Sequence, residues 1–172
     1  MKSIVRIATI LLLVLMPSLS AMAQSTPESA SDELTPFAFG LDAPATFIDQ
    51  RGNAIFSISV TGIEQNWQDH DEYDMPQMGM EYVQVHLAIT NHAGRDGTVM
   101  PYTMLMLDSM GAVLQMGYIY DRPDVWIDEV VVPAGETVEG SMIFEIYPDL
   151  EPLALMWQPE YTSYVIVYLG DE

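Results

Sequence analysis

The densest cluster of potential metal ligands is an acidic loop at residues 69–74, DHDEYD. Hard cations such as Ca²⁺ take about six to eight oxygen ligands, which carboxylates in a loop between strands can supply. We therefore predict a calcium site formed by Asp69, Asp71 and Asp74, with help from a neighbouring loop such as residues 121–124. A solvated acidic loop is the alternative, because the segment lacks the glycine that an EF-hand loop has at its sixth position.

A methionine-rich run follows at residues 75–80, in which Met75, Met78 and Met80 have a Met-x-x-Met-x-Met spacing. Thioether sulfur is a soft ligand that suits Cu(I), so this run is a second candidate metal site, with His70 and His92 as further ligands. Methionine also fills gaps in apolar cores, and a packing role is the competing interpretation.

The sequence has no motif that is typical of an enzyme. It lacks a Gly-x-Ser-x-Gly turn, a His-Glu-x-x-His helix, a phosphate-binding loop and any cysteine. His86 falls on the polar side of its predicted strand, without an acid or nucleophile beside it in register. Two carboxylates could still meet in space as in a glycosidase, but a small domain without a deep cleft disfavours this. We predict no catalytic residues, no cofactor, and a protein that binds its ligand without transforming it.

The scaffold that positions these side chains is predicted to consist of β-strands. Residues 81–91 alternate most clearly, with Val83, Val85, Leu87 and Ile89 on one face. Further strands, separated by turn signals, are predicted at residues 54–61, 102–107, 112–120, 126–132, 136–147, 153–157 and 164–169. No long segment has helical periodicity. The pattern predicts an all-β antiparallel sandwich of about 7–9 strands.

Several aromatic residues are out of phase with the predicted core: Tyr118, Tyr120, Trp126, Tyr161, Tyr164 and Tyr168. In the last strand Tyr164, Ile166 and Tyr168 share one face, while the opposite face is also apolar. Such a strand is either covered on both faces or displays an aromatic patch that binds a protein or glycan. Both interpretations stay open at this stage.

The first 23 residues have the form of a signal peptide. Lys2 and Arg6 precede an apolar run at residues 7–16, and Ala21-Met22-Ala23 is a small-x-small cleavage site. A retained membrane anchor is the alternative. We predict cleavage near Ala23 and a secreted or periplasmic protein, with a flexible acidic Ser/Pro linker at residues 24–39 and a single domain at residues 40–172.

Removal of the signal peptide would leave 149 residues with all 25 acidic side chains and only Arg51, Arg95 and Arg122 as basic ones, a net charge of −22. This charge repels phosphate backbones and anionic lipid headgroups, so nucleic-acid and membrane-surface functions are disfavoured and a protein or cationic partner is favoured. Without cysteine the chain forms no disulfide and has no site for a lipid anchor, so its core must supply the stability.

Three stretches resemble a known family. Residues 76–91 follow a Pro-x-x-Gly-x-x-Tyr-Val-x-Val-x-Leu-x-Ile-x-Asn pattern, a Leu-x-Asp-x-x-Gly hairpin ends at Gly111, and residues 131–145 read VVPAGETVEGSMIFE, before a closing Leu-x-Leu-x-Trp. The order is similar to that of secreted immunoglobulin-like sandwiches catalogued as domain of unknown function 4352, whose architecture is shared with a mycobacterial secreted immunoprotective antigen. The resemblance covers Gly52 to Leu169 and implies an immunoglobulin-like fold and export, but no catalytic residues. It also implies a turn role for Gly135, close packing at Gly140, and a strand-end turn at Asn91.

Overall fold

The computed structural model describes residues 35–120, 122–160 and 163–170. The predicted signal peptide at residues 1–23, the first part of the predicted linker and Tyr161 lie outside these residues. All the described residues belong to one compact unit, which spans residues 33–172. In this part of the chain, no helix has both the length and the apolar character needed to cross a bilayer.

The described chain contains eleven strands and one short 3₁₀ helix. The strands are β1 (Phe37–Phe39), β2 (Ala45–Ile48), β3 (Ala54–Gln65), β4 (Glu81–Asn91), β5 (Gly97–Val99), β6 (Met104–Asp108), β7 (Val113–Gln115), β8 (Val130–Val132), β9 (Thr137–Ile146), β10 (Pro152–Glu160) and β11 (Ser163–Tyr168), and the helix is Pro101–Thr103. The all-β sandwich predicted from the sequence is confirmed.

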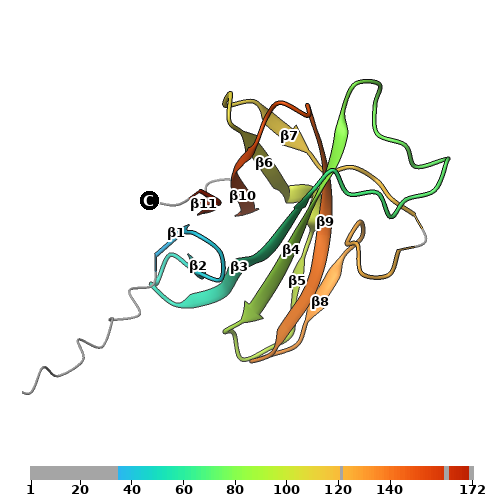
Figure 1. The fold of residues 1–172 in the computed structure, drawn as a ribbon. Coiled ribbons are helices and arrows are strands. Elements are labelled where there is room, and N and C mark those ends of the chain that lie inside the picture. Colours follow the sequence, from blue (N-terminus) through green and yellow to red (C-terminus); the bar gives the residue numbers. More distant parts are fainter. Residues whose placement is uncertain (1–34, 121, 161–162, 171–172) are drawn as a thin grey trace, which may run out of the picture. The chain divides into compact units, whose positions relative to one another are not determined.

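Two main sheets form the layers of the sandwich (Figure 1). One has the strand order β1-β11-β10-β6-β7, the other has the order β2-β3-β4-β9, and β5 and β8 form a small third sheet. Every pairing is antiparallel except that of β1 with β11, which is parallel. Strand β1 lies within the segment predicted as linker, so the sandwich begins before residue 40 and that boundary is corrected.

The core lies between the two main sheets. Val83, Val85, Leu87 and Ile89 of β4 are completely buried, as the alternation of that strand predicts. They belong to the same cluster as the inward-facing side chains of the five-stranded sheet, which are Ala38, Met104, Met106, Leu155, Trp157, Val165 and Val167. The cluster continues through Phe144 and Ile146 of β9, so burial of apolar side chains from both sheets stabilises the fold.

Residues 116–120 and 122–127 form a segment that does not continue β7 but crosses the free edge of β9, as the gold trace in Figure 1 shows. Gly117 N–H donates to Ile143 O over 2.7 Å, and Trp126 N–H donates to Ser141 O over 2.8 Å. The predicted strands at 112–120 and 126–132 are therefore too long, because the observed ones are β7 and β8. These bonds satisfy backbone groups that an uncovered edge strand would present to other chains.

The same segment covers part of the outer face of the four-stranded sheet. Ile119 and Val125 pack there with Tyr82, Ile143 and Trp67 in a second, smaller cluster. Tyr82 falls on the side of β4 that the sequence predicts to be polar, yet only 3% of it is exposed. Its ring lies edge-on to His70 at 5.3 Å and to Trp67 at 6.1 Å.

Burial raises the pKa of the Tyr82 phenol, and the nearby carboxylates of Glu145 and Asp74 raise this pKa further. The folded protein thus holds the phenolic proton more tightly than the unfolded chain does. The stability from Tyr82 is fully present below pH 10, the ordinary pKa, and is lost as pH rises through the higher pKa of the folded state. Urea unfolding between about pH 8 and pH 11 should show this decline, and the Tyr82→Phe variant should lose less stability over the same range. Equal declines in both proteins would contradict this assignment.

Candidate functional site

Two aspartates of the acidic loop, Asp69 and Asp71, accept hydrogen bonds from other groups of the protein. Both Asp69 carboxylate oxygens accept hydrogen bonds from the Arg122 guanidinium, at 2.5 and 2.8 Å. The Asp71 Oδ1 atom accepts hydrogen bonds from the backbone N–H groups of Tyr73 and Asp74, at 2.8 and 3.2 Å. Within the described ranges, no three acidic or histidine side chains are grouped so that they could hold a metal ion. The structure thus does not bring Asp69, Asp71 and Asp74 together as one ligand set, and calcium binding there stays a prediction.

The three methionines of the second candidate metal site have different surroundings. Met75 and Met78 are exposed, whereas Met80 is partly buried and lines a hollow beside β7. His70 packs on Tyr82, and His92 is hydrogen bonded to Ser57. Copper binding by Met75, Met78 and Met80 likewise stays a prediction.

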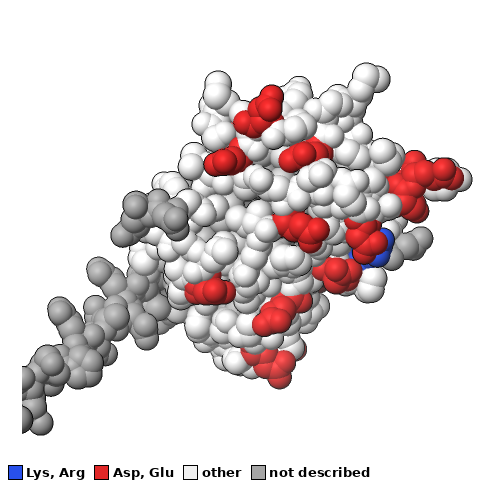
Figure 2. All heavy atoms as spheres, viewed as in Figure 1, with Lys and Arg blue, Asp and Glu red and all other residues white. Residues whose placement is uncertain are grey.

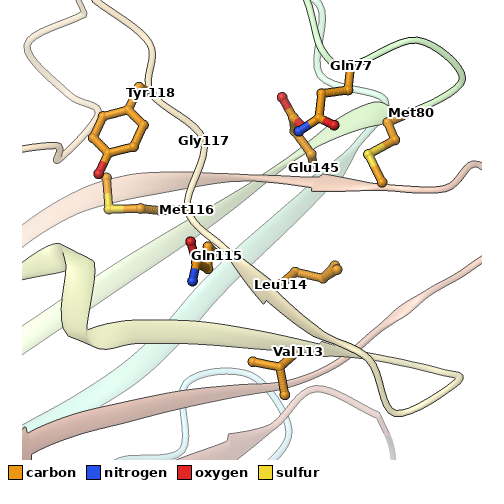
Figure 3. A pocket seen from close by; sticks show the side chains of 9 residues that line it. All are labelled: Gln77, Met80, Val113, Leu114, Gln115, Met116, Gly117, Tyr118 and Glu145. Carbon is orange, nitrogen blue, oxygen red and sulfur yellow. The ribbon is translucent and has the colours of Figure 1, made fainter.

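The hollow beside β7 has a volume of about 330 Å³. Figure 3 shows Gln77, Met80 and Glu145 along one side of it, and Val113, Leu114 and Gln115 of β7 along another. Glu145 is the only ionisable side chain in its lining other than the Tyr118 phenol. General acid–base or nucleophilic chemistry needs partner groups that this lining does not supply.

A second hollow, also of about 330 Å³, contains His86 together with Asp124 and Glu139. The only hydroxyl nucleophile there besides Thr61 is Ser141, which is buried. The Ser141 Oγ atom donates to Asp124 O over 3.0 Å and accepts from Gln84 Nε2 over 2.9 Å. These bonds fix the segment that crosses β9 and direct the hydroxyl away from a catalytic role.

Sequence reasoning missed one Ser–His pair, Ser57 and His92, whose Oγ and Nε2 atoms lie 2.9 Å apart. The two residues are 35 positions apart and meet only through the pairing of β3 with the end of β4. A catalytic pair also needs a group that orients the imidazole and donors for an oxyanion. His92 is exposed, and neither residue lines any of the four hollows described. The pair is best explained as a surface hydrogen bond.

The most distinctive surface feature is the outer face of the five-stranded sheet. Strand register aligns its outward side chains in two rows, each crossing β1, β11, β10, β6 and β7. The first row is Phe37, Ile166, Met156, Leu105 and Gln115, and the second is Phe39, Tyr168, Ala154, Leu107 and Val113. We call these ten residues, together with Tyr164, the apolar face.

The apolar face contains no charged side chain, although the chain has 25 acidic residues. Four of its members are about half exposed: Phe37 (45%), Phe39 (53%), Val113 (53%) and Tyr164 (50%). Phe39 stacks on Tyr168 with ring centroids 4.9 Å apart and planes within 8°. By contrast, Figure 2 shows carboxylates scattered over the surface in view, with basic atoms only at one place beside acidic ones.

Both interpretations of the last strand hold in part. Strand β11 lies inside its sheet, between β1 and β10, and its inner residues Val165 and Val167 are in the core. Its outer face nevertheless shows the aromatic patch, because Tyr164 is half exposed. Tyr118 and Tyr120 are exposed elsewhere, on the segment that crosses β9, and Trp126 packs against the core.

Three hollows adjoin the apolar face. The hollow beside β7 includes Val113 and Gln115 of the face in its lining. A second, of about 390 Å³, is lined by Leu105 of the face and by Met100, Tyr102, Thr103, Gln158, Pro159 and Glu160. A third, of about 280 Å³, includes Tyr164 in its lining. The face is therefore an open apolar surface with depressions at its margin, which suits contact with another macromolecule better than enclosure of a small molecule.

No protein-family model matches this sequence, and no curated protein sequence matches it. Solved structures do match. The fold is that of a secreted mycobacterial protein. This protein, MPT63 from Mycobacterium tuberculosis, superposes with a TM-score of 0.58 and 14% identity, over 75% of this chain and 94% of that one.

Two Bacillus subtilis proteins share the fold as well. The candidate lipoprotein YcdA matches with a TM-score of 0.55 and 14% identity over 67% of this chain, which spans only 36% of that protein. YjhA matches with a TM-score of 0.50 and 10% identity, over 67% of this chain and 91% of that one. At these identities the likeness establishes a common β-sandwich fold.

Proposed function

We propose that this chain is an exported, non-enzymatic binding module that holds a protein partner on the apolar face. The observation that supports this proposal most directly is a five-strand-wide surface without a single charge on an otherwise strongly acidic protein. Apolar patches of this extent on a soluble domain mark interaction sites, because exposing them to water costs free energy and invites aggregation.

Export is supported by two independent features. Residues 1–23 have the charge, apolar run and small-x-small site of a signal peptide. The fold is shared with a protein described as secreted and with a candidate lipoprotein. We accordingly propose a secreted or periplasmic location, and membership of the sandwich family catalogued as domain of unknown function 4352, which the motifs at residues 76–91 and 131–145 support.

The chemistry of the partner follows from the chemistry of the face. Recognition relies on burying aromatic and aliphatic surface, because the rows offer no carboxylate to pair with a cation. The acidic surface around the face repels anionic molecules, so nucleic acid and anionic lipid stay disfavoured as partners. Calcium binding is not favoured as a second function, since Arg122 neutralises Asp69 in the acidic loop.

Site-specific photocrosslinking in the native envelope tests this proposal. A benzophenone amino acid at Tyr164 is expected to give a discrete adduct, because this half-exposed side chain lies on the proposed contact surface. The matched control places the same group at Tyr73, which is 86% exposed on the acidic loop and outside the face. Absence of adducts at Tyr164, or the same adducts from both positions, would overturn the proposal.

A further inference from the structure

We infer, building on the proposed function, that the occupant of the apolar face is a second copy of this chain, related by a two-fold axis that runs along strand β10. The apolar face has large side chains on one side and smaller ones on the other. Its aromatic side chains lie on β1 and β11, at one side: Phe37, Phe39, Tyr164 and Tyr168. The other side, on β6 and β7, has the smaller side chains Leu105, Leu107, Val113 and Gln115.

Between these two halves lies β10, which contributes Met156 and the fully buried Ala154. A rotation by a half-turn about an axis along β10 places β1 of one copy over β7 of the other, and β11 over β6. The half of each copy that has the large aromatic side chains then meets the half of the other copy that has the smaller side chains, and β10 packs on β10. A surface that is high on one side and low on the other is self-complementary under this operation.

Charge favours a second copy over a cationic protein. Two chains of this acidity repel each other, and they can approach only through a surface that lacks carboxylates. The apolar face is such a surface, and the same lack of carboxylates leaves a basic partner without ion pairs there. Like-charge repulsion outside the face also predicts that association strengthens with added salt.

The area of the face suits a weak dimer. Its five strands have 3, 6, 9, 5 and 3 residues in the order β1, β11, β10, β6 and β7. At about 3.3 Å per residue and about 4.8 Å between strands, they give a projected footprint of roughly 410 Å² per copy before the height of the side chains is counted. This is below the roughly 600 Å² per partner at the lower end of specific interfaces, so the association is expected to be weak. Two sheets that meet face to face pack about 10 Å apart with strands nearly aligned, so the dimer would be a stack of sheets like the interior of the sandwich itself.

Sedimentation velocity of the mature protein at about 5 to 200 µM tests the inference. We expect a monomer–dimer equilibrium that shifts toward dimer at about 0.5 M salt. Phe39→Glu and Val113→Arg should each raise the dissociation constant at least about a hundredfold, because each places a charge in the apolar contact. Both positions are half exposed in the single chain, so the fold should tolerate these changes. Tyr73→Glu, outside the face, should dimerise like the unchanged protein.

Mixing the two variants tests the axis itself. Phe39 and Val113 occupy the two ends of one row, so the axis along β10 places Phe39 of each copy over Val113 of the other. An equimolar mixture of Phe39→Glu and Val113→Arg should therefore recover dimer, with one carboxylate–guanidinium pair and one unchanged contact. A mixture that stays monomeric would overturn the inferred axis, as would variants that dimerise normally.

Unchanged protein that stays monomeric over the whole range would overturn the second copy as occupant. That result would leave the proposed function standing if photocrosslinks at Tyr164 join this chain to a different protein. Loss of the Tyr164 crosslinks together with the dimer would remove both.

Discussion

Replacing Asn91 with alanine is expected to lower the free energy of unfolding by about 3–5 kcal/mol, roughly 10 °C in melting temperature. Asn91 is completely buried at the end of β4. Its Nδ2 atom donates to the carbonyl oxygens of Arg95 and Val132, both at 2.9 Å, and its Oδ1 atom accepts from Ala93 N–H at 2.9 Å. Alanine would leave these backbone groups without partners in a place that water reaches poorly.

The effect should be large because Asn91 joins three parts of the fold. Its side chain ties the turn after β4 to β8, and its backbone exchanges hydrogen bonds with Glu136 and Gly135 in the turn before β9. Asn53→Ala is the matched control, since the Asn53 side chain bonds only the exposed Asp49 carboxylate at a turn. We expect a change below about 1 kcal/mol there. Urea unfolding followed by tryptophan fluorescence would measure both, and similar losses would refute the special role of Asn91.

The sequence predicts best those strands whose own residues alternate between apolar and polar over a long run. Strand β4 was predictable because its alternation persists through Val83, Val85, Leu87 and Ile89, all completely buried. Strand β1 was not, because three residues beside a Ser/Pro-rich stretch give no periodic signal, and the strand pairs only with β11, which is distant in the sequence. The predicted strands at 112–120 and 126–132 are longer than β7 and β8 because apolar residues such as Ile119 and Ile127 pack in the cluster on the outer face of the other sheet.

The apolar face was predictable only in part, because it depends on pairing between strands that are far apart in the sequence. The alternation of β11 placed Tyr164, Ile166 and Tyr168 on one face, but could not say whether that face was covered. The rows that make it a surface join five strands from Phe37 to Tyr168, and their alignment depends on register between strands far apart in sequence. The Ser57–His92 hydrogen bond was not predictable either, because the two residues are 35 positions apart in the sequence.

The close packing expected at Gly140 from the family resemblance is found, and so is the turn expected at Gly135, whose φ is +73°. The indole ring of Trp126 lies directly against the Gly140 Cα, so that a Cβ atom built there would overlap the Cε2, Nε1 and Cζ2 atoms of the ring. The backbone of Trp126 is held beside β9, because its backbone N–H donates to Ser141 O at 2.8 Å. Glycine at 140 thus lets the crossing segment close against β9.

Gly140→Ala is therefore expected to cost about 2–4 kcal/mol, since the methyl group must displace a packed indole or the strand beneath it. Tryptophan emission should shift to longer wavelength if the ring moves toward water, and unfolding in urea would give the free-energy change. Gly94→Ala is the control, because a Cβ atom there meets nothing within 4 Å. In the background of Trp126→Ala the cost of Gly140→Ala should largely vanish, since the overlapping atoms are gone. A cost that persists in that background would place the strain in the β9 backbone and contradict the contact with Trp126.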